Sequence, residues 1–170
     1  MFSVELLPDA GIEAAIRAEW ERLIEAGLPS AGRHSGFSNR PHLTLAVRDQ
    51  LDAQQVAGLA GLAAALPLPL ELDGILLFGG AERVILARHV VVTAALREFH
   101  AAVAEWLGPP EPRYASTASD HWSPHVTLAR RIDAAQLSDA LRAVDVRPLR
   151  GAATALRIWD AATRTVTMLE

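Results

Sequence analysis

Hydrophobic positions in the first half of the chain alternate between the period of a strand and the period of a helix. Residues 2–7 are apolar-rich and end at Pro8, which is typical of a short strand, and apolar residues from Ile12 to Ile24 then recur at helical spacing. This half predicts a strand over residues 2–7, a helix that Asp9 caps and Gly27 ends, a strand over 41–47, a helix over 53–66, and two strands over 68–72 and 75–78 that meet at a turn around Asp73-Gly74.

The second half repeats the same order of patterns. It predicts a strand over residues 83–92, a helix over 93–107, a strand over 124–130, a helix over 133–144, and two strands over 149–159 and 163–169. Each half is therefore strand, helix, strand, helix, strand, strand. We expect one α+β domain over residues 1–170 that arose by pseudo-twofold duplication, with repeats of about 1–80 and 81–170.

A short motif, Pro-His-x-Thr, occurs once in each half at the start of a strand that follows a long polar loop. Its histidines, His42 and His125, are 83 residues apart, close to half the chain. Composition alone predicts about 0.02 occurrences of this motif in such a chain. Because side chains alternate across a strand, His42 and Thr44 should share one face, as should His125 and Thr127, with apolar residues on the other. A pseudo-twofold axis between the two halves would bring the two His/Thr pairs together across a groove.

Two imidazoles and two hydroxyls that face each other are too polar for a hydrophobic core, but they suit a catalytic site. The unperturbed pKa of histidine, about 6.5, lets one copy act as a neutral base while its twin acts as a charged acid near neutral pH. Such a pair suits in-line phosphoryl transfer, in which one imidazole takes a proton from the attacking group and the other donates one to the departing oxygen. Threonine hydroxyls can donate to the non-bridging phosphate oxygens. This chemistry needs neither a metal nor a nucleophile on the protein.

Composition narrows the chemistry further. The 170-residue chain has no Cys, which excludes thiolate nucleophiles, disulfides and zinc-thiolate or iron–sulfur sites, and all 16 of its basic residues are Arg, which excludes a catalytic lysine. No serine-hydrolase, phosphate-loop or dinucleotide motif is present. The formal net charge of −4 provides no global positive field for nucleic acid, so phosphate recognition must be local.

With these paired motifs, the sequence resembles the 2H phosphoesterases, the superfamily of bacterial 2'-5' RNA ligases and RNA 2',3'-cyclic phosphodiesterases, whose hallmark is two His-x-Thr/Ser-x motifs. The resemblance implies a bilobal α+β fold in which two antiparallel sheets line a central cleft, with helices outside. It implies metal-independent opening of a cyclic phosphate, on an RNA end or a small nucleotide, to a 2'-phosphate without a cofactor, and reversible 2'-5' ligation as a further activity. The resemblance also implies that His42 and His125 are catalytic and that Thr44 and Thr127 bind phosphate.

Two long loops run directly into the motifs, and loops of more than about 12 residues are uncommon unless they are functional or disordered. They offer arginines for phosphates and aromatic rings for bases. By alternation, Arg131 should share the face of His125 while Arg130 points the other way. The candidate substrate-binding residues in the loops and just after the second motif are Arg40, Phe37, Tyr114, Trp122, Arg130 and Arg131.

Two alternatives to a paired-histidine enzyme stay open. In one, a metallohydrolase site forms from His34, His42, His121 and Asp120. In the other, the duplicated cleft binds RNA ends or a nucleotide without turnover. The intact histidines argue against a pure binding role, because arginine serves phosphate binding better.

The remaining features predict core packing and location. Trp20, Trp106 and Trp159 lie in apolar patterns, which favours a core role over ligand stacking. The amino terminus has no basic stretch before an apolar one, and the longest weakly polar stretch, residues 56–70, is shorter than the roughly 20 residues that a spanning helix needs. We expect a cytoplasmic monomer without a membrane partner.

Overall fold

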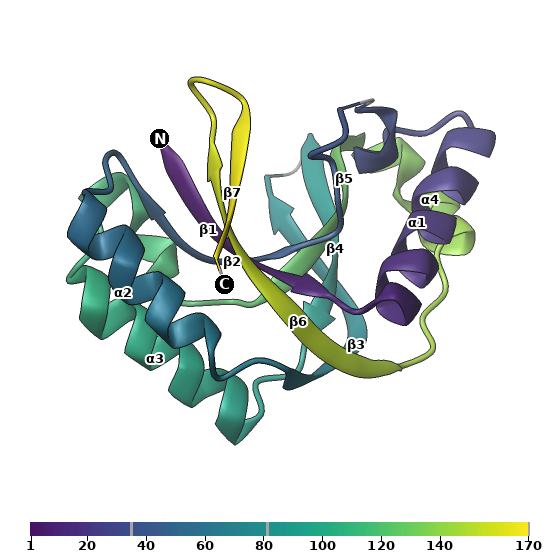
Figure 1. Cartoon of the computed structure of the whole chain (residues 1–170). Helices are drawn as coiled ribbons and strands as arrows, with labels where there is room; N and C mark the ends of the chain where they lie inside the picture. The colour runs from purple at the N-terminus through teal and green to yellow at the C-terminus, as the bar shows by residue number, and fades with distance from the viewer. Residues whose placement is uncertain (35, 81, 170) are drawn as a thin grey trace.

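Antiparallel strands form the middle of the molecule, and α-helices lie outside them (Figure 1). The computed structural model describes residues 1–34, 36–80 and 82–169. The strands are β1 (Phe2–Pro8), β2 (Leu43–Arg48), β3 (Leu68–Gly79), β4 (Arg83–Val90), β5 (His125–Asp133), β6 (Leu149–Asp160) and β7 (Thr165–Leu169). The helices are α1 (Ala10–Glu25), α2 (Ala53–Ala63), α3 (Ala94–Leu107) and α4 (Leu137–Ala143), with short 3-10 turns η1 (Ala31–Arg33), η2 (Pro112–Thr117) and η3 (Ala134–Gln136).

Side-chain caps determine where three of the helices begin. Asp9 Oδ1 accepts a hydrogen bond of 2.9 Å from the backbone N–H of Ile12 at the start of α1, which confirms the predicted cap. Asp52 and Gln55 form a capping box at α2, and Thr93 caps α3. Within the described residues, no helix combines the length and apolarity needed to cross a lipid bilayer.

The described strands pair antiparallel in the order β2-β1-β6-β3-β4-β5, with β7 beside β6. Strand β6 lies inside this order and joins its two sides, because residues 153–160 pair with β1 and residues 149–153 pair with β3. The trio β2-β1-β6 therefore has the same arrangement as the trio β5-β4-β3. In each trio the third strand comes from the other half of the chain.

The α+β class, the antiparallel pairing and the outer helices confirm the predicted fold class, while the number of sheets differs from the prediction of two. Strands β3 and β6 are each 12 residues long. Each is long enough to pair with its partner strand at one end and with the other long strand at the other end. Hydrogen bonding therefore continues between the two trios, and the described strands form one sheet.

The Asp73-Gly74 segment is a second difference from the sequence prediction. Strand β3 continues through it, with a register shift against β4 between Leu72 and Ile75. Gly74 has a φ of 73°, a conformation that glycine adopts at little cost. The segment is a bulge in one long strand, not the turn of a hairpin. Hairpin turns and bulges favour the same residues, which is why the local sequence predicts a turn where the structure has a bulge.

The helices pair across the two halves of the chain. Helix α1 packs with α4 at one end of the sheet, and α2 packs with α3 at the other (Figure 1). The apolar residues within the two motif strands face the core, since Leu43, Leu45, Val126 and Leu128 are each at most 1% exposed. The motif histidines and threonines, in contrast, are partly exposed, as strand alternation predicts.

Candidate active site

The two motif histidines are held in the same way. Nδ1 of His42 lies 2.8 Å from the carbonyl oxygen of Arg40, and Nδ1 of His125 lies 2.8 Å from the carbonyl oxygen of Ser123. A carbonyl oxygen can only accept a hydrogen bond, so Nδ1 carries a proton and donates it in both rings. Nε2 of each ring is thereby left available for a ligand.

The backbone of each motif accepts a hydrogen bond from a tryptophan in the opposite half of the chain. Trp122, just before β5, donates from Nε1 to the carbonyl oxygen of Thr44 at 3.0 Å, and Trp20 of α1 donates to the carbonyl oxygen of Thr127 at 3.1 Å. These two bonds tie each motif strand to the other half. Both threonine side chains are partly exposed, so their hydroxyls can reach a ligand.

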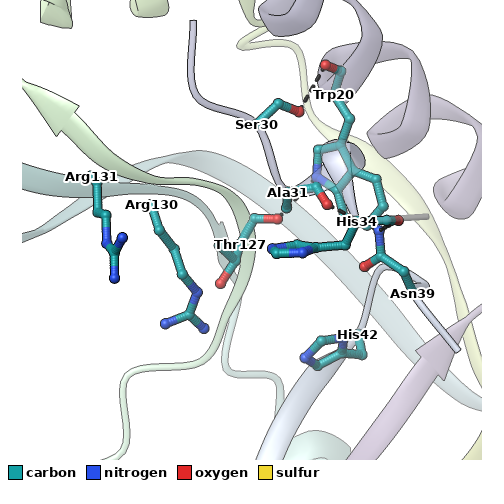
Figure 2. A pocket seen from close by; sticks show the side chains of 9 residues that line it. All are labelled: Trp20, Ser30, Ala31, His34, Asn39, His42, Thr127, Arg130 and Arg131. Atoms are coloured by element: carbon teal, nitrogen blue, oxygen red, sulfur yellow. Dashed lines mark hydrogen bonds between the residues drawn. The ribbon is translucent and has the colours of Figure 1, made fainter. Parts of the chain in front are cut away.

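A cavity of about 410 Å³ opens beside the motifs (Figure 2). Figure 2 shows the side chains of Arg130 and Arg131 side by side on β5, with Thr127, His34 and His42 around the same opening. The lining holds two guanidinium groups and two imidazoles but no carboxylate among the described residues, so it suits an anionic ligand. We refer to this space as the cationic cavity, and its lining residues are Trp20, Ser30, Ala31, His34, Asn39, His42, Thr127, Arg130 and Arg131.

Both arginines after the second motif line this cavity, although strict alternation predicted that Arg130 would point away. The strand register shifts here, so that Ile85 of β4 faces both Arg130 and Arg131 of β5. Arg131 has a φ of 64°, in the left-handed region. A bulge of this kind interrupts the two-residue period of a strand, which explains why both side chains reach one opening.

The surroundings of His125 disfavour its charged form. Burial lowers the pKa of the His125 imidazole below its usual range, and the positive charges of Arg130 and His42 act in the same direction. The hydrogen bond to the carbonyl oxygen of Ser123 acts in the opposite direction. The ring of Phe78 covers the imidazole with 4.6 Å between ring centroids, which accounts for part of the burial. His125 and His42 are therefore close enough to influence each other electrostatically.

Glu5 of β1 distinguishes the surroundings of His42. Its Oε1 lies 3.6 Å from Nε2 of His42, an ion-pair distance when the imidazole is protonated. Its Oε2 accepts a hydrogen bond of 2.7 Å from Arg157, which also donates to the carbonyl oxygen of Ser38 at 2.9 Å. The side chains of Glu5 and Arg157 are each only 4% exposed. Sequence reasoning did not place Glu5 in the site, and the signal that identifies it is one charge in an otherwise apolar strand.

A second cavity, of about 500 Å³, adjoins the first and shares His34, Asn39 and His42 with it. Trp159 borders this second space and is only partly buried, which corrects the prediction that it belongs to the core. The apolar pattern of the sequence does not distinguish an indole on the solvent-facing side of a strand from one in the core. The rest of the lining is Glu5, Gly36, Ser38, Arg157 and Arg164.

Four of the predicted substrate-binding residues, Arg40, Phe37, Tyr114 and Trp122, line neither cavity. The guanidinium of Arg40 pairs with a carboxylate of α1 at 2.5 Å, and the phenol of Tyr114 donates to another carboxylate at 3.0 Å. The indole of Trp122 stacks on buried His100, with 3.8 Å between ring centroids. Phe37 instead projects into solvent with 88% of its surface exposed. Their position in long loops was the only signal for these residues, and it does not specify where a side chain points.

The metal-ligand cluster of the metallohydrolase alternative does not come together. His34 and His42 line the cationic cavity, whereas His121 and Asp120 lie 3.5 Å from each other on the surface and line neither cavity. Over residues 1–34, 36–80 and 82–169, no group of three or more His, Asp or Glu side chains is placed to hold a metal ion. The imidazoles therefore face the cavity without carboxylate partners arranged for coordination.

Comparison with known proteins identifies the family. The family model of the 2'-5' RNA ligase superfamily matches residues 12–165. A search of curated protein sequences finds no match. Solved structures with a similar fold include TT0787 of Thermus thermophilus (TM-score 0.60, 19% identity, 99% of this chain and 94% of that chain), E. coli LigT complexed with 3'-AMP (0.59, 16%, 99% and 94%) and Kluyveromyces marxianus Usb1 (0.56, 15%, 99% and 96%). At these identities the likeness concerns the fold alone.

The antiparallel α+β fold and the paired His-x-Thr motifs together define the two-histidine class of phosphoesterases. Because the family model spans most of its length, the chain belongs to the 2'-5' RNA ligase superfamily.

Proposed function

We propose that the protein is a metal-independent phosphodiesterase that opens a 2',3'-cyclic phosphate, on an RNA end or a small nucleotide, to a 2'-phosphate. One observation carries this proposal: each motif histidine is held at Nδ1 by a backbone carbonyl oxygen, and one residue of each motif, His42 and Thr127, lines the cationic cavity. Membership of the 2'-5' RNA ligase superfamily supports the same class of reaction. A cytoplasmic location and a monomeric state stay predictions from the sequence.

The different surroundings of the two histidines support different roles for them in this proposal. His125 acts as the general base, because burial favours its neutral form with a lone pair on Nε2. His42 acts as the general acid, because its Nε2 lies 3.6 Å from the Glu5 carboxylate, an ion-pair distance when the imidazole is protonated. Arg157 offsets part of the charge of Glu5 but also holds the carboxylate in place beside Nε2 of His42.

The reaction is a single in-line displacement at phosphorus. Water attacks opposite the departing O3', and Nε2 of His125 takes a proton from the water as the new P–O bond forms. Nε2 of His42 gives its proton to O3' as the P–O3' bond breaks, so the product has a 2'-phosphate and a free 3'-hydroxyl. The hydroxyls of Thr44 and Thr127 donate to the non-bridging oxygens, where charge accumulates in the transition state. Proton exchange with solvent then restores both histidines.

Reversible 2'-5' RNA ligation is a second activity that this geometry supports. If a 5'-hydroxyl of another RNA takes the place of water, the same displacement forms a 2'-5' phosphodiester. His125 then removes the proton from that hydroxyl, and His42 protonates O3' as before. Ligation therefore requires no residue beyond those that hydrolysis uses, but it requires room for a second RNA end beside His125.

The test is hydrolysis of nucleoside 2',3'-cyclic phosphates and of RNA with a cyclic-phosphate end, in buffer that contains EDTA. We expect turnover by the wild type and its loss in both His42→Ala and His125→Ala, with the 2'-phosphate as product. Loss of wild-type activity in EDTA that returns with added metal would support the metallohydrolase alternative. Tight binding without product under either condition would support a binding role.

A further inference from the structure

The second cavity has a different chemical character from the cationic cavity. Its residues from β6 include Arg157 and Trp159, which lie two positions apart and so share one face of the strand. In the same register, Arg157 is opposite Glu5 of β1, and Glu5 is opposite Thr44 of β2. A continuous row across three strands therefore places Trp159 beside the Glu5–Arg157 pair that faces His42.

We propose that this second cavity binds the nucleoside portion of the substrate, with the base packed on Trp159 and a phosphate on its 5' side bound by Arg164. The inference rests on the proposed function and narrows the substrate to a nucleotide unit that continues in the 5' direction, such as the 3' end of an RNA. The cationic cavity would then serve the cyclic phosphate itself.

The direction of the displacement supports this division. The leaving oxygen, O3', belongs to the ribose of the nucleoside, and in an in-line reaction it departs on the side opposite the attacking water. The proposed acid, His42, must therefore lie on the nucleoside side. His42 lines both cavities, whereas Thr127, Arg130 and Arg131 line only the cationic one, so a nucleoside in the second cavity can have its phosphate in the cationic cavity with His42 between the two.

The chemistry of the lining fits a base and a phosphate. Trp159 is the aromatic residue that borders this space, and a partly exposed indole is a stacking surface for any base. The buried guanidinium of Arg157 is already occupied by Glu5 and by the carbonyl oxygen of Ser38. Arg164, in the loop between β6 and β7, is exposed and has no ion pair within the described part of the chain, so it is available to a phosphate.

The first experiment separates base recognition from catalysis. Steady-state kinetics of the wild type, Trp159→Ala and Trp159→Phe would be compared on adenosine 2',3'-cyclic phosphate and on the same cyclic phosphate of ribose without a base. We expect Trp159→Ala to lower kcat/KM about 5- to 150-fold on the adenosine substrate alone, and Phe to restore most of it. Equal losses on both substrates, or no loss, would overturn the base subsite. The matched control is Trp106→Phe, because Trp106 lies on α3 and donates to Gln55 away from both cavities.

Binding distinguishes failure of this inference from failure of the proposed function. Calorimetric titration with adenosine 2'-monophosphate needs no turnover, and we expect Trp159→Ala to weaken it while Trp106→Phe does not. If the wild type binds this nucleotide through Trp159 but opens no cyclic phosphate, the proposed function fails and the base subsite stands. If the wild type hydrolyses the adenosine substrate and Trp159→Ala is equally active and binds equally well, the base subsite fails and the proposed function stands.

Arg164 is tested separately with substrates that differ only in a 5'-phosphate. We expect the wild type to prefer the 5'-phosphorylated nucleoside 2',3'-cyclic phosphate by a few-fold and to lose part of this preference at high salt. Arg164→Asn should abolish the preference, and asparagine tolerates the left-handed φ of 57° at this position. Arg142→Gln on exposed α4 is the control. An unchanged preference in Arg164→Asn would overturn the phosphate contact.

Discussion

The two His-x-Thr motifs have the same sequence pattern and the same local geometry, yet they lie in different electrostatic surroundings. Each histidine donates from Nδ1 to the carbonyl oxygen two residues before it at 2.8 Å. Around His42 lies the buried Glu5 carboxylate, whereas around His125 lie Phe78 and the charge of Arg130. A repeated motif thus supplies two similar imidazoles, and the residues around them differ in charge and burial, which is the basis of the acid and base roles proposed above.

The largest expected effect comes from removing either imidazole. His125→Gln and His42→Gln should each lower kcat/KM by about 10²–10⁴-fold, the usual contribution of a general acid or base. Steady-state hydrolysis of a nucleoside 2',3'-cyclic phosphate measures this effect. His121→Gln is the control, because His121 lies on the surface beside Asp120 and lines neither cavity. Full activity in either motif variant would contradict the pairing of the two motifs.

The next effect comes from the threonine hydroxyls. Thr127→Val and Thr44→Val keep the branched shape but remove a donor to the charged phosphate, a bond that contributes about 1.5–3 kcal/mol, or about 10- to 150-fold in rate. The loss should appear mainly in kcat, because the charge on the non-bridging oxygens increases in the transition state. Thr127 should matter at least as much as Thr44, because it lines the cationic cavity. A loss confined to KM would contradict a role in the transition state.

The pH dependence examines the difference between the two histidines directly. His125 must be neutral to act as base, and its pKa is lowered, so the acid limb of kcat/KM should lie below the ordinary histidine value of about 6.5. Glu5→Gln removes a negative charge beside His42 while leaving the surroundings of His125 intact, so it should leave this acid limb in place.

Other charged groups near His42 also affect the pH profile, and a variant outside both cavities serves as the control. Besides Glu5, the charged or titratable groups that share a cavity with His42 are His34, Arg130, Arg131, Arg157 and Arg164. Glu13→Gln is the control, because Glu13 pairs with Arg17 and Arg40 outside both cavities and should leave the acid limb in place. Movement of the acid limb in Glu5→Gln would contradict the assignment of that limb to His125.

The smallest effect concerns the two tryptophan hydrogen bonds to the motif strands. Trp20→Phe and Trp122→Phe each remove one donor to a threonine carbonyl oxygen and should lower the free energy of unfolding by about 0.5–1.5 kcal/mol, apart from any packing change. Trp20 should cost more, because it is only 3% exposed and its orphaned carbonyl acceptor cannot readily be rehydrated. Urea unfolding followed by circular dichroism measures both. A larger loss for Trp122 would contradict this order.

Local signals in the sequence predicted most of the elements and the alternation of side chains along the two motif strands. The cap at Asp9 and the alternation around Leu43 and Val126 are encoded within a few neighbouring residues, and the structure has each of them. Predictions failed where a side chain's direction depended on a strand partner. Arg130 turns into the cavity because of a bulge against β4, and Trp159 borders a cavity because β6 pairs with β1.

The sequence by itself determined the family and the two copies of the His-x-Thr motif, because motifs and hydrophobic periods are properties of neighbouring residues. The tertiary structure alone decided that the described strands join in one sheet. It also brought Glu5 into contact with Arg157 beside His42, although 152 residues separate the two, and it made His42 part of the lining of two adjoining cavities. The physical reason is that burial, ion pairing and strand register depend on residues distant in sequence. Those distant contacts are what make two identical motifs unequal.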